Sequence, residues 1–224
     1  KIKWVRINMK AIYIYGASGH GLVVADIARA CGYDDVIFVD DGDNEYPSFE
    51  DIKRTSGIPV AFGIGSNSIR AKLFERVQNS GFEIVSLIHP SAIISSSVTI
   101  GKGTVVMPNV VVNAKATIGD GVILNSSCVV EHECMIDDFV HISPKVALAG
   151  DVKVGEFTHI GIGSNVIQGI IIEKNVTVGG GSMVIRNIED NQKVVGVPAR
   201  LIPSASNRGG VNSSFYFPTS RKAS

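Results

Sequence analysis

The chain has 224 residues and carries 21 basic and 21 acidic side chains, so its formal net charge is zero. This balance gives no support for a nucleic acid or an anionic membrane as a partner, and no apolar run approaches the ~18 residues that a membrane-spanning helix requires. The three cysteines, Cys31, Cys128 and Cys134, form no CxxC pair, which is typical of a reduced compartment. We therefore expect a cytoplasmic protein with no membrane or nucleic-acid partner.

Residues 1–9 are short and charged, and we expect an N-terminal extension rather than a secretory leader. Residues 10–89 then alternate between strand and helix patterns. The expected strands are Lys10–Tyr15, Val36–Asp41, Val60–Gly65 and Ile84–His89, and the expected helices are Leu22–Cys31, a segment around Phe49–Thr55, and Asn67–Ser80. Strands separated by helices of this length indicate parallel pairing with right-handed crossovers. Residues 10–89 therefore predict a small α/β domain of Rossmann-like type, which binds ligands at the carboxyl ends of its strands.

A glycine-rich loop, Gly16–Gly21, follows the first expected strand and opens the first expected helix. Backbone N–H groups and the helix dipole favour phosphate at such a place. The loop is not GxGxxG, so it gives only weak support for a dinucleotide. Asp40 follows Gly16 by 24 residues, which is about where the acid of a Rossmann fold meets a ribose. The pattern favours a nucleotide with a pyrophosphate and leaves NAD and a nucleotide sugar open, and a tight strand-to-helix turn is the alternative without a ligand.

Beyond residue 88 the chain has a strict period of six. Every sixth residue from Ile88 to Val184 is Ile, Leu or Val, seventeen times in succession: Ile88, Ile94, Ile100, Val106, Val112, Ile118, Leu124, Val130, Ile136, Ile142, Leu148, Val154, Ile160, Val166, Ile172, Val178 and Val184. Helices prefer spacings of three and four and ordinary strands a spacing of two, whereas a period of six is typical of a hexapeptide β-helix. We expect a parallel β-helix over residues 90–202 that follows the first domain without a flexible linker, then a C-terminal extension of unknown role at 203–224.

A second rhythm of eighteen residues is superimposed on the first, since small or acidic residues recur at that interval after the aliphatic positions. They are Gly101, Gly119, Asp137, Gly155 and Glu173. Eighteen residues are three hexads, so one coil should have three faces and a triangular cross-section. Outward residues of these faces are not uniformly polar, with Val110–Val111 and Ile170–Ile171 as examples. We therefore expect the faces to be covered by packing three copies into a trimer.

His132 lies two residues beyond the inward Val130, at the expected corner of a coil, between Glu131 and Glu133. A histidine beside a carboxylate is a good general base, because the acid orients the imidazole and increases its basicity. The alternative is a solvated polar corner. Cys134 could be a nucleophile partnered by His132, but a small buried thiol that packs is the favoured interpretation.

Two further histidines, His141 and His159, are separated by eighteen residues, so we expect them to stack one coil apart. Together with His132 they also suggest a metal site. The γ-class carbonic anhydrases are β-helical trimers that bind zinc through histidines. Their pair of histidines five residues apart has no counterpart in this chain, and no metal is expected.

Seven segments together resemble one family. They are YIYGASGHG, FVDD, GIGSN, LIHPSA, NAKATIGDGVILN, EHEC and GVPA. These segments, over about residues 10–202, resemble the NeuD-type sugar O-/N-acyltransferases, and within that family the bacillosamine-pathway N-acetyltransferases are the most similar. The resemblance implies a homotrimer of left-handed β-helices, with acetyl-CoA as co-substrate in the groove between neighbours and a nucleotide-sugar-binding role for residues 10–89. The implied reaction acetylates the 4-amino group of UDP-4-amino-4,6-dideoxy-N-acetylglucosamine to give UDP-N,N′-diacetylbacillosamine.

By the same resemblance, residues of this chain take three roles. His132 corresponds to the general base and Glu133 to the acid that increases its basicity. The positions that correspond to contacts with acetyl-CoA are His141, Ile162 and Gly180. The positions that correspond to the nucleotide-sugar site are Ser18, Gly19, His20, Asp40, Asp41 and Gly65. His159 has no role assigned by the resemblance.

The mechanism implied is direct transfer in a ternary complex. His132 takes a proton from the amine as the amine attacks the thioester, and backbone N–H groups of the coils hold the oxyanion. Within the family, O-acetylation of sialic acid and acylation of another nucleotide amino sugar are the rivals. Outside it, the rivals are a γ-type metal lyase and a non-catalytic scaffold that senses a nucleotide.

Overall fold

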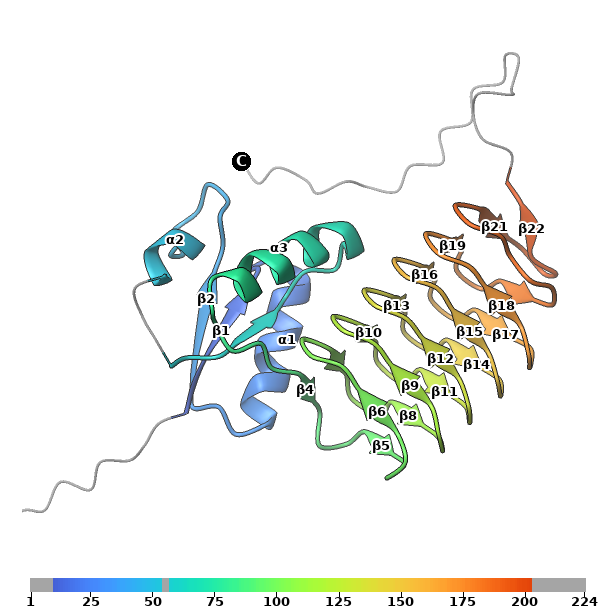
Figure 1. Cartoon of the computed structure of the whole chain (residues 1–224), viewed down its shortest axis with the longest axis horizontal. Helices are drawn as coiled ribbons and strands as arrows, with labels where there is room; N and C mark the ends of the chain where they lie inside the picture. Colours follow the sequence, from blue (N-terminus) through green and yellow to red (C-terminus); the bar gives the residue numbers. More distant parts are fainter. Residues whose placement is uncertain (1–9, 54–56, 203–224) are drawn as a thin grey trace, which may run out of the picture.

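The computed structural model describes residues 10–53 and 57–202, so the two terminal extensions expected from the sequence lie outside the described residues. The described chain has an α/β part followed by a long solenoid of short parallel strands (Figure 1). The solenoid is a left-handed parallel β-helix, and the predicted fold class is confirmed. None of the helices within the described ranges has the length and apolar content needed to cross a membrane.

The α/β part has a three-stranded parallel sheet with the order β2-β1-β3. Its strands are β1 (Ala11–Tyr15), β2 (Asp35–Val39) and β3 (Val60–Phe62), and its helices are α1 (Gly19–Ala30), α2 (Phe49–Ile52) and α3 (Asn67–Asn79). The central strand β1 is almost fully buried, as its apolar run requires. The order places the carboxyl ends of β1 and β3 side by side, next to the N-termini of α1 and α3.

The fourth strand that the sequence predicts for this sheet is not formed as expected. Ile84 makes only an isolated parallel bridge to Val60. The chain then leaves the sheet, and Leu87–Ile88 becomes β4, the first strand of the solenoid. An apolar segment of six residues satisfies either pairing, and the hexad pattern that begins at Ile88 decides in favour of the solenoid.

The solenoid has three parallel sheets, one for each face of the prism. Sheet 1 contains β4 (Leu87–Ile88), β7 (Val105–Val106), β10 (Ile123–Leu124), β13 (His141–Ile142), β16 (His159–Ile160), β19 (Thr177–Val178), β21 (Lys193–Val195) and the antiparallel β22 (Arg200–Leu201). Sheet 2 contains β5 (Ile93–Ile94), β8 (Val111–Val112), β11 (Val129–Val130), β14 (Ala147–Leu148), β17 (Asn165–Val166) and β20 (Met183–Val184). Sheet 3 contains β6 (Thr99–Ile100), β9 (Thr117–Ile118), β12 (Met135–Ile136), β15 (Lys153–Val154) and β18 (Ile171–Ile172).

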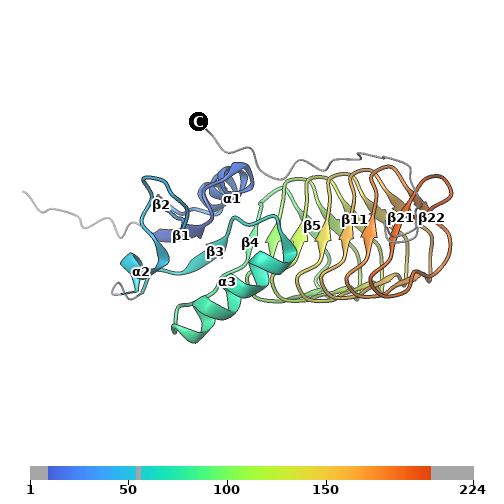
Figure 2. The ribbon, with the colours of Figure 1, turned by 90° about the horizontal axis from the view of Figure 1, so that it is seen from above.

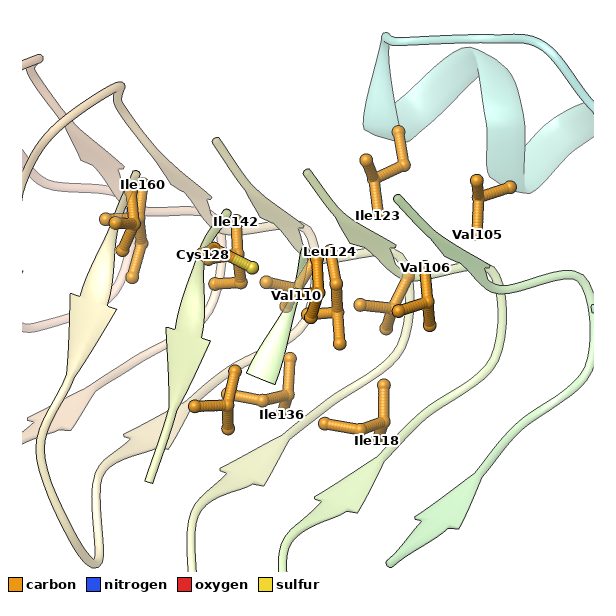
Figure 3. Packing of buried hydrophobic residues seen from close by; sticks show 14 of the residues in the cluster. Val105, Val106, Val110, Ile118, Ile123, Leu124, Cys128, Ile136, Ile142 and Ile160 are labelled. Carbon is orange, nitrogen blue, oxygen red and sulfur yellow. The ribbon is translucent and has the colours of Figure 1, made fainter. Parts of the chain in front are cut away.

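The aliphatic residues of the six-residue period fill the interior of the prism, as Figure 3 shows for several coils. All of them from Val106 to Val184 are buried. The first three are only partly buried, and Ile88 is 39% exposed, because no earlier coil covers the open end of the stack. A second inward row lies two residues before each aliphatic position, and Cys128 and Cys134 belong to it. The sequence pattern alone reveals only one of the two rows.

The second inward row also changes the interpretation of the outward apolar residues. Val110 and Ile170 belong to it and are buried inside their own chain. Only Val111, on sheet 2, and Ile171, on sheet 3, point outward. Each of the two apolar pairs expected on the outside therefore contributes only one outward residue, and these two residues lie on different faces.

The α/β part packs on sheet 1 at the end where the chain enters the solenoid (Figures 1 and 2). One continuous hydrophobic cluster joins β1 and α1 to the inward rows of the coils. On the other side, Phe74 of α3 meets Phe139 edge-on at 5.4 Å between ring centroids, and Phe139 stacks on Phe157 of the next coil at 5.6 Å. Each coil is held to its neighbour by backbone ladders, so the solenoid is a rigid support for the α/β part.

Candidate active site

The corner after β11 carries His132. Nδ1 of its imidazole lies 3.2 Å from Oε2 of Glu133. Glu133 has a φ of 62°, the left-handed conformation that turns the corner and directs its carboxylate back toward the ring. The side chains are 59% and 53% exposed, so a ligand can reach both. With Nδ1 facing the carboxylate, Nε2 is the atom left to exchange a proton with a substrate.

Gly150 lies one coil beyond His132, at the same corner. A Cβ placed on Gly150 would be 2.5 Å from Cε1 and 2.6 Å from Nε2 of His132, which is closer than nonbonded atoms approach. The imidazole therefore lies directly against the Gly150 backbone. His132, Gly150 and Gln168 line an open cavity of about 490 Å³. Glycine at position 150 keeps Nε2 uncovered toward this cavity.

Cys134 is fully buried, and its Sγ donates a hydrogen bond to the carbonyl of Ala149 at 3.2 Å. Burial raises the pKa of its thiol. Cys128, one hexad earlier, is also fully buried, and burial raises its thiol pKa to about 12. A buried neutral thiol is a poor nucleophile, so the geometry favours the packing interpretation for both cysteines.

His141 and His159 stack as the spacing of eighteen predicts, with ring centroids 4.7 Å apart and planes 7° from parallel. His20 of α1 approaches the same row, with its ring centroid 6.3 Å from that of His141. Asn125 lies 3.2 Å from Nε2 of His141, and Ser143 lies 2.8 Å from Nε2 of His159. The row joins the α/β part to sheet 1.

All three histidines of this row favour the neutral form. Burial, with a contribution from the nearby Arg70 charge, lowers the pKa of His20 to about 4. Burial also lowers the pKa of His141 well below its usual value, and His159, Arg70 and His20 add to the shift. His159 keeps part of its surface exposed, yet burial of its ring and the Arg70 charge still lower its pKa. Neutral imidazoles can both donate and accept hydrogen bonds, which suits a polar ligand.

The glycines in and near the glycine-rich loop Gly16–Gly21 have two different functions. A Cβ on Gly21 would lie 2.0 Å from the Gly16 carbonyl oxygen, and one on Gly63 would lie 2.6 Å from the same atom. These three glycines therefore allow a close backbone crossing between the loop, α1 and the end of β3. A Cβ placed on Gly19 or on Gly65 would have no atom within 4 Å, so these two glycines border open space. The second pair is the one that a ligand could approach.

Ser18 and Ser66 are the N-cap residues of α1 and α3, and neither side chain caps its helix. Two helix N-termini thus lie at the same edge of the sheet with backbone N–H groups available to an anion. Asp40 is used within the chain, because Oδ2 accepts from the Ala17 amide at 2.9 Å and Oδ1 accepts from Gly42 at 2.8 Å. Its carboxylate shapes the glycine loop as well as bordering it.

Asp41 is also engaged within the chain. It accepts hydrogen bonds from the Tyr15 hydroxyl, the Arg76 guanidinium and the Phe49 amide. Burial pushes the pKa of Asp41 up, but the three hydrogen bonds and the Arg76 charge outweigh it and leave the pKa below its usual value. Asp41 therefore organises the end of β2 through a network that Arg76 extends to Glu50.

Ile162 and Gly180 lie one coil apart at the corner between sheets 1 and 2. Ile162 is 60% exposed, and a Cβ on Gly180 would lie 3.1 Å from its Cγ2. They form an apolar edge beyond the histidine row. His132 lies elsewhere, at the corner between sheets 2 and 3, which is opposite sheet 1 in the triangular coil.

A single chain therefore brings His20, His141 and Gly65 together but leaves His132 on the far side of the prism. In the described ranges, no group of three or more His, Cys, Asp or Glu side chains is placed to hold a metal ion. The metal-lyase alternative has no ligand set within the described part of one chain.

Known proteins resemble this chain over part or most of its length. The family described as the PglD N-terminal domain matches residues 11–77. The UDP-N-acetylbacillosamine N-acetyltransferase of Bacillus subtilis (strain 168) is 39% identical over 114 residues, which are 44% of this chain and 52% of that relative. The alignment thus spans about half the length of the curated relative.

Two solved structures match much more of the chain. The acetyltransferase domain of PglB from Neisseria gonorrhoeae FA1090 is 36% identical with a TM-score of 0.81, and the match covers 86% of this chain and all of that one. A variant of GDP-perosamine N-acetyltransferase from Caulobacter crescentus, in complex with CoA and GDP-perosamine, is 36% identical with a TM-score of 0.84, covering 87% of this chain and 97% of that one. The chain belongs to the NeuD/PglD family of sugar acyltransferases. The resemblance stated from the sequence motifs is confirmed.

The motifs that identify the chain as a NeuD/PglD family member do not reveal several residues that contact the candidate site side chains. Gly150 follows His132 by eighteen residues and Ser143 follows Asn125 by eighteen, so the coil period could have identified both as stacked neighbours. Arg70 carries no such signal. It lies in the first turn of an amphipathic helix, where an arginine is ordinarily solvated.

Proposed function

We propose that the chain transfers the acetyl group of acetyl-CoA to the amino group of a nucleotide-linked amino sugar, and that the acceptor is UDP-4-amino-4,6-dideoxy-N-acetylglucosamine. The observation that carries the proposal is the likeness to the N-acetyltransferase bound to CoA and GDP-perosamine, which extends over 97% of that protein. The acetyltransferase domain of PglB has also been solved with acetyl coenzyme A. The curated relative from Bacillus subtilis supports the bacillosamine series as the acceptor.

His132 is the general base of the proposed reaction. The amine nitrogen attacks the thioester carbon, and Nε2 of His132 takes the proton that the nitrogen loses. The C–S bond then breaks, and the CoA thiolate leaves and can receive that proton. Glu133 holds the Nδ1 side of the ring at 3.2 Å, which leaves Nε2 free as the acceptor. Backbone N–H groups of the coils stabilise the oxyanion.

The nucleotide-sugar site is proposed at the junction of the α/β part and sheet 1. The free N-termini of α1 and α3 suit the pyrophosphate. The open backbone at Gly19 and Gly65 allows the ligand to approach closely. Ser18 and His20 supply polar groups there, and Nε2 of His20 is buried with no hydrogen-bond partner among the described residues. An unsatisfied buried nitrogen of this kind is suited to a ligand.

The proposed site requires more than one copy of the chain, because His132 is opposite the sheet that carries the α/β part. Sheet 2 also presents outward apolar side chains such as Ile93, which is 68% exposed, and the half-buried Val111 and Val129. A homotrimer covers such a face and sets His132 of one copy beside the His141, Ile162 and Gly180 edge of another. Light scattering at micromolar concentration should give three times the chain mass, and a monomer mass would contradict the shared site.

Turnover with matched acceptors tests the function. Thiol release from acetyl-CoA would be measured with the UDP-4-amino sugar, with GDP-perosamine and with sialic acid, and products would be identified by mass spectrometry. The proposal expects the highest kcat/KM with the UDP-4-amino sugar and acetylation at nitrogen. A preference for GDP-perosamine would contradict the proposed acceptor and indicate a different nucleotide amino sugar. Acetylation of sialic acid would indicate an O-acetyltransferase. No thiol release with any acceptor would favour a non-catalytic scaffold.

A further inference from the structure

Arg70 is a buried arginine with no carboxylate partner among the described residues. It is the fourth residue of α3 and is 1% exposed. Its guanidinium contacts six hydrogen-bond acceptors with five N–H groups, so one N–H of Nη2 is shared between two of them. Nε donates to Gly121 O at 2.6 Å, and Nη1 donates to Ile64 O at 3.0 Å and Gly65 O at 3.3 Å. Nη2 lies 2.8 Å from Asn67 Oδ1, 3.1 Å from Phe139 O and 3.5 Å from Val140 O. Burial lowers its pKa to about 10, so the side chain is still charged at neutral pH.

The acceptors of Arg70 come from two parts of the molecule. Ile64 and Gly65 belong to the turn between β3 and α3, and Gly121, Phe139 and Val140 belong to two successive coils of the solenoid. A planar guanidinium with five N–H donors can satisfy carbonyls on both sides in one fixed geometry, whereas a lysine cannot. Arg70 therefore fixes the distance between the turn and the coils.

The two sides differ in rigidity. The coils are held independently of Arg70, since the Ile123 amide donates to Val140 O at 2.9 Å within the ladder of sheet 1. Beyond Phe62, where β3 ends, one more bond of the β1–β3 ladder remains, from the Gly63 amide to Tyr15 O at 2.8 Å, and the described turn has none at Ile64 or Gly65. Asn67 supports the same junction, because its Nδ2 donates to Phe157 O at 2.8 Å. Loss of the Arg70 contacts should consequently release the turn and leave the coils in place.

Gly65 belongs both to the set of Arg70 acceptors and to the candidate nucleotide-sugar site. Its carbonyl oxygen accepts from Arg70 at 3.3 Å, and a Cβ placed on it would meet open space. Arg70 also donates to Val140 O, on the residue before His141, so one side chain contacts the backbone beside both site residues. We propose that Arg70 is a positioning residue of the nucleotide-sugar site, which holds the Ile64–Gly65 turn against the rigid coils so that its backbone and His141 present a preformed surface to the ligand. The proposal rests on the proposed function for the identity of that ligand.

A purely structural role for Arg70 makes a different prediction. An arginine that only stabilises the fold would change the fraction of folded protein, which scales apparent kcat and leaves both KM values unchanged. If Arg70 is a positioning residue, its substitution should raise the KM for the nucleotide sugar and leave the KM for acetyl-CoA unchanged. It also changes the local opening of the turn, which amide hydrogen exchange measures without any substrate.

The experiment compares Arg70→Lys with Arg70→Gln, using the full chain in its assembled form. Arg29→Lys is the matched control, because Arg29 is an exposed arginine of α1 whose partner is Asp26. For Arg70→Lys we expect the KM for the UDP-amino sugar to rise about 10-fold, with kcat and the KM for acetyl-CoA changed less than about 2-fold, since an interaction with one substrate in the ground state is weakened. Amides of residues 63–67 should exchange faster, while those of β10 and β13 should not. Arg70→Gln should show a larger rise or fail to fold, and Arg29→Lys should match the wild type.

Two results would overturn the positioning role. One is a wild-type KM for the nucleotide sugar in Arg70→Lys, and the other is unchanged exchange at residues 63–67. Failure of the proposed function is separate, since it would appear as an absence of transfer by the wild-type protein to any nucleotide sugar. The hydrogen-exchange comparison still decides the effect of Arg70 on the turn in that case.

Discussion

The two regions of the candidate site differ in how their side chains are held. At the corner, His132 and Glu133 are more than half exposed and share one hydrogen bond. At the junction, Arg70 is 1% exposed and contacts six hydrogen-bond acceptors, and His20 of α1 lies against His141 of sheet 1. A general base must stay accessible to an incoming substrate, whereas a binding surface gains affinity when its groups are already held in the geometry that the ligand requires. Changes at the corner should therefore affect kcat, and changes at the junction should affect KM and stability.

The largest effect expected from this comparison is at His132. His132→Ala should lower kcat by roughly 10²–10⁴, the usual contribution of a general base, with little change in either KM. The side chain is exposed and donates to no buried partner among the described residues, so its loss should leave the fold intact. Steady-state kinetics with both substrates varied would measure the effect, and circular dichroism with light scattering would confirm the fold and assembly.

Glu133 provides the graded control for His132. Glu133→Gln should cost less than His132→Ala, because the carboxylate orients the ring without handling the proton. The amide keeps the hydrogen-bonding group and isolates the effect of charge. Full activity in His132→Ala, with the assembly intact, would reject the proposed mechanism and the assignment of the corner as the reacting half.

A substitution at Gly150 tests whether the effect of this corner on kcat depends only on the position of the His132 imidazole. A methyl group at this position would lie 2.6 Å from Nε2 of His132 and displace the ring. Gly150→Ala should lower kcat by up to about 10²-fold, since misplacing a catalytic group by about 1 Å can cost that much, with both KM values unchanged. The double variant His132→Ala/Gly150→Ala supplies the control.

In the double variant there is no ring to displace, so Gly150→Ala should add almost nothing to the loss from His132→Ala. A double-mutant cycle measures this coupling directly. Additive losses would mean that Gly150 acts elsewhere, for instance on the coil backbone. The prediction then fails even if His132 itself is the base.

The junction should make stability depend on pH. His20 has its folded-state pKa lowered to about 4 from a usual value near 6.5, and that of His141 is lowered in the same direction. The folded chain thus binds these protons more weakly than the unfolded chain, so stability falls as pH decreases below about 6.5, and for His20 the loss is complete below about 4. For His20 alone the loss at pH 5 should be about 2 kcal/mol.

Denaturant unfolding at pH 7 and pH 5 would measure this loss, with His20→Gln as the comparison. The glutamine cannot titrate in this range, so the variant should lose less stability on acidification than the wild type does. Equal slopes in wild type and His20→Gln would show that the junction histidine does not contribute.

The solenoid and its corner could be predicted from the sequence because they repeat. The period of six places Val130 inside, and two further residues bring His132 to a corner. The stacking of His141 on His159 follows from a separation of eighteen residues. In a repeat, a local rule gives long-range neighbours, since each coil lies on the next with the same register.

The junction could not be predicted in the same way. Arg70 meets Gly121 and Phe139, which follow it by 51 and 69 residues, and no period connects a helix to a solenoid. The segment that includes Ile84 and Leu87 has the pattern of a single strand, yet it divides between a bridge to Val60 and the first strand of the solenoid. These outcomes depend on how two independently patterned parts pack, which tertiary contacts decide.

The smallest effect is expected at Cys134, which lies two residues from His132 but points inward. Its thiol is fully buried, donates to Ala149 O and has its pKa raised by burial, so it should not react. Cys134→Ala should retain kcat and both KM values and lose about 1 kcal/mol of stability from the small cavity it creates. Pre-steady-state mixing with acetyl-CoA alone should show no burst of CoA release. An inactive but folded Cys134→Ala, or a burst in the wild type, would instead indicate an acyl-enzyme, and the reacting group would lie inside the prism rather than at its exposed corner.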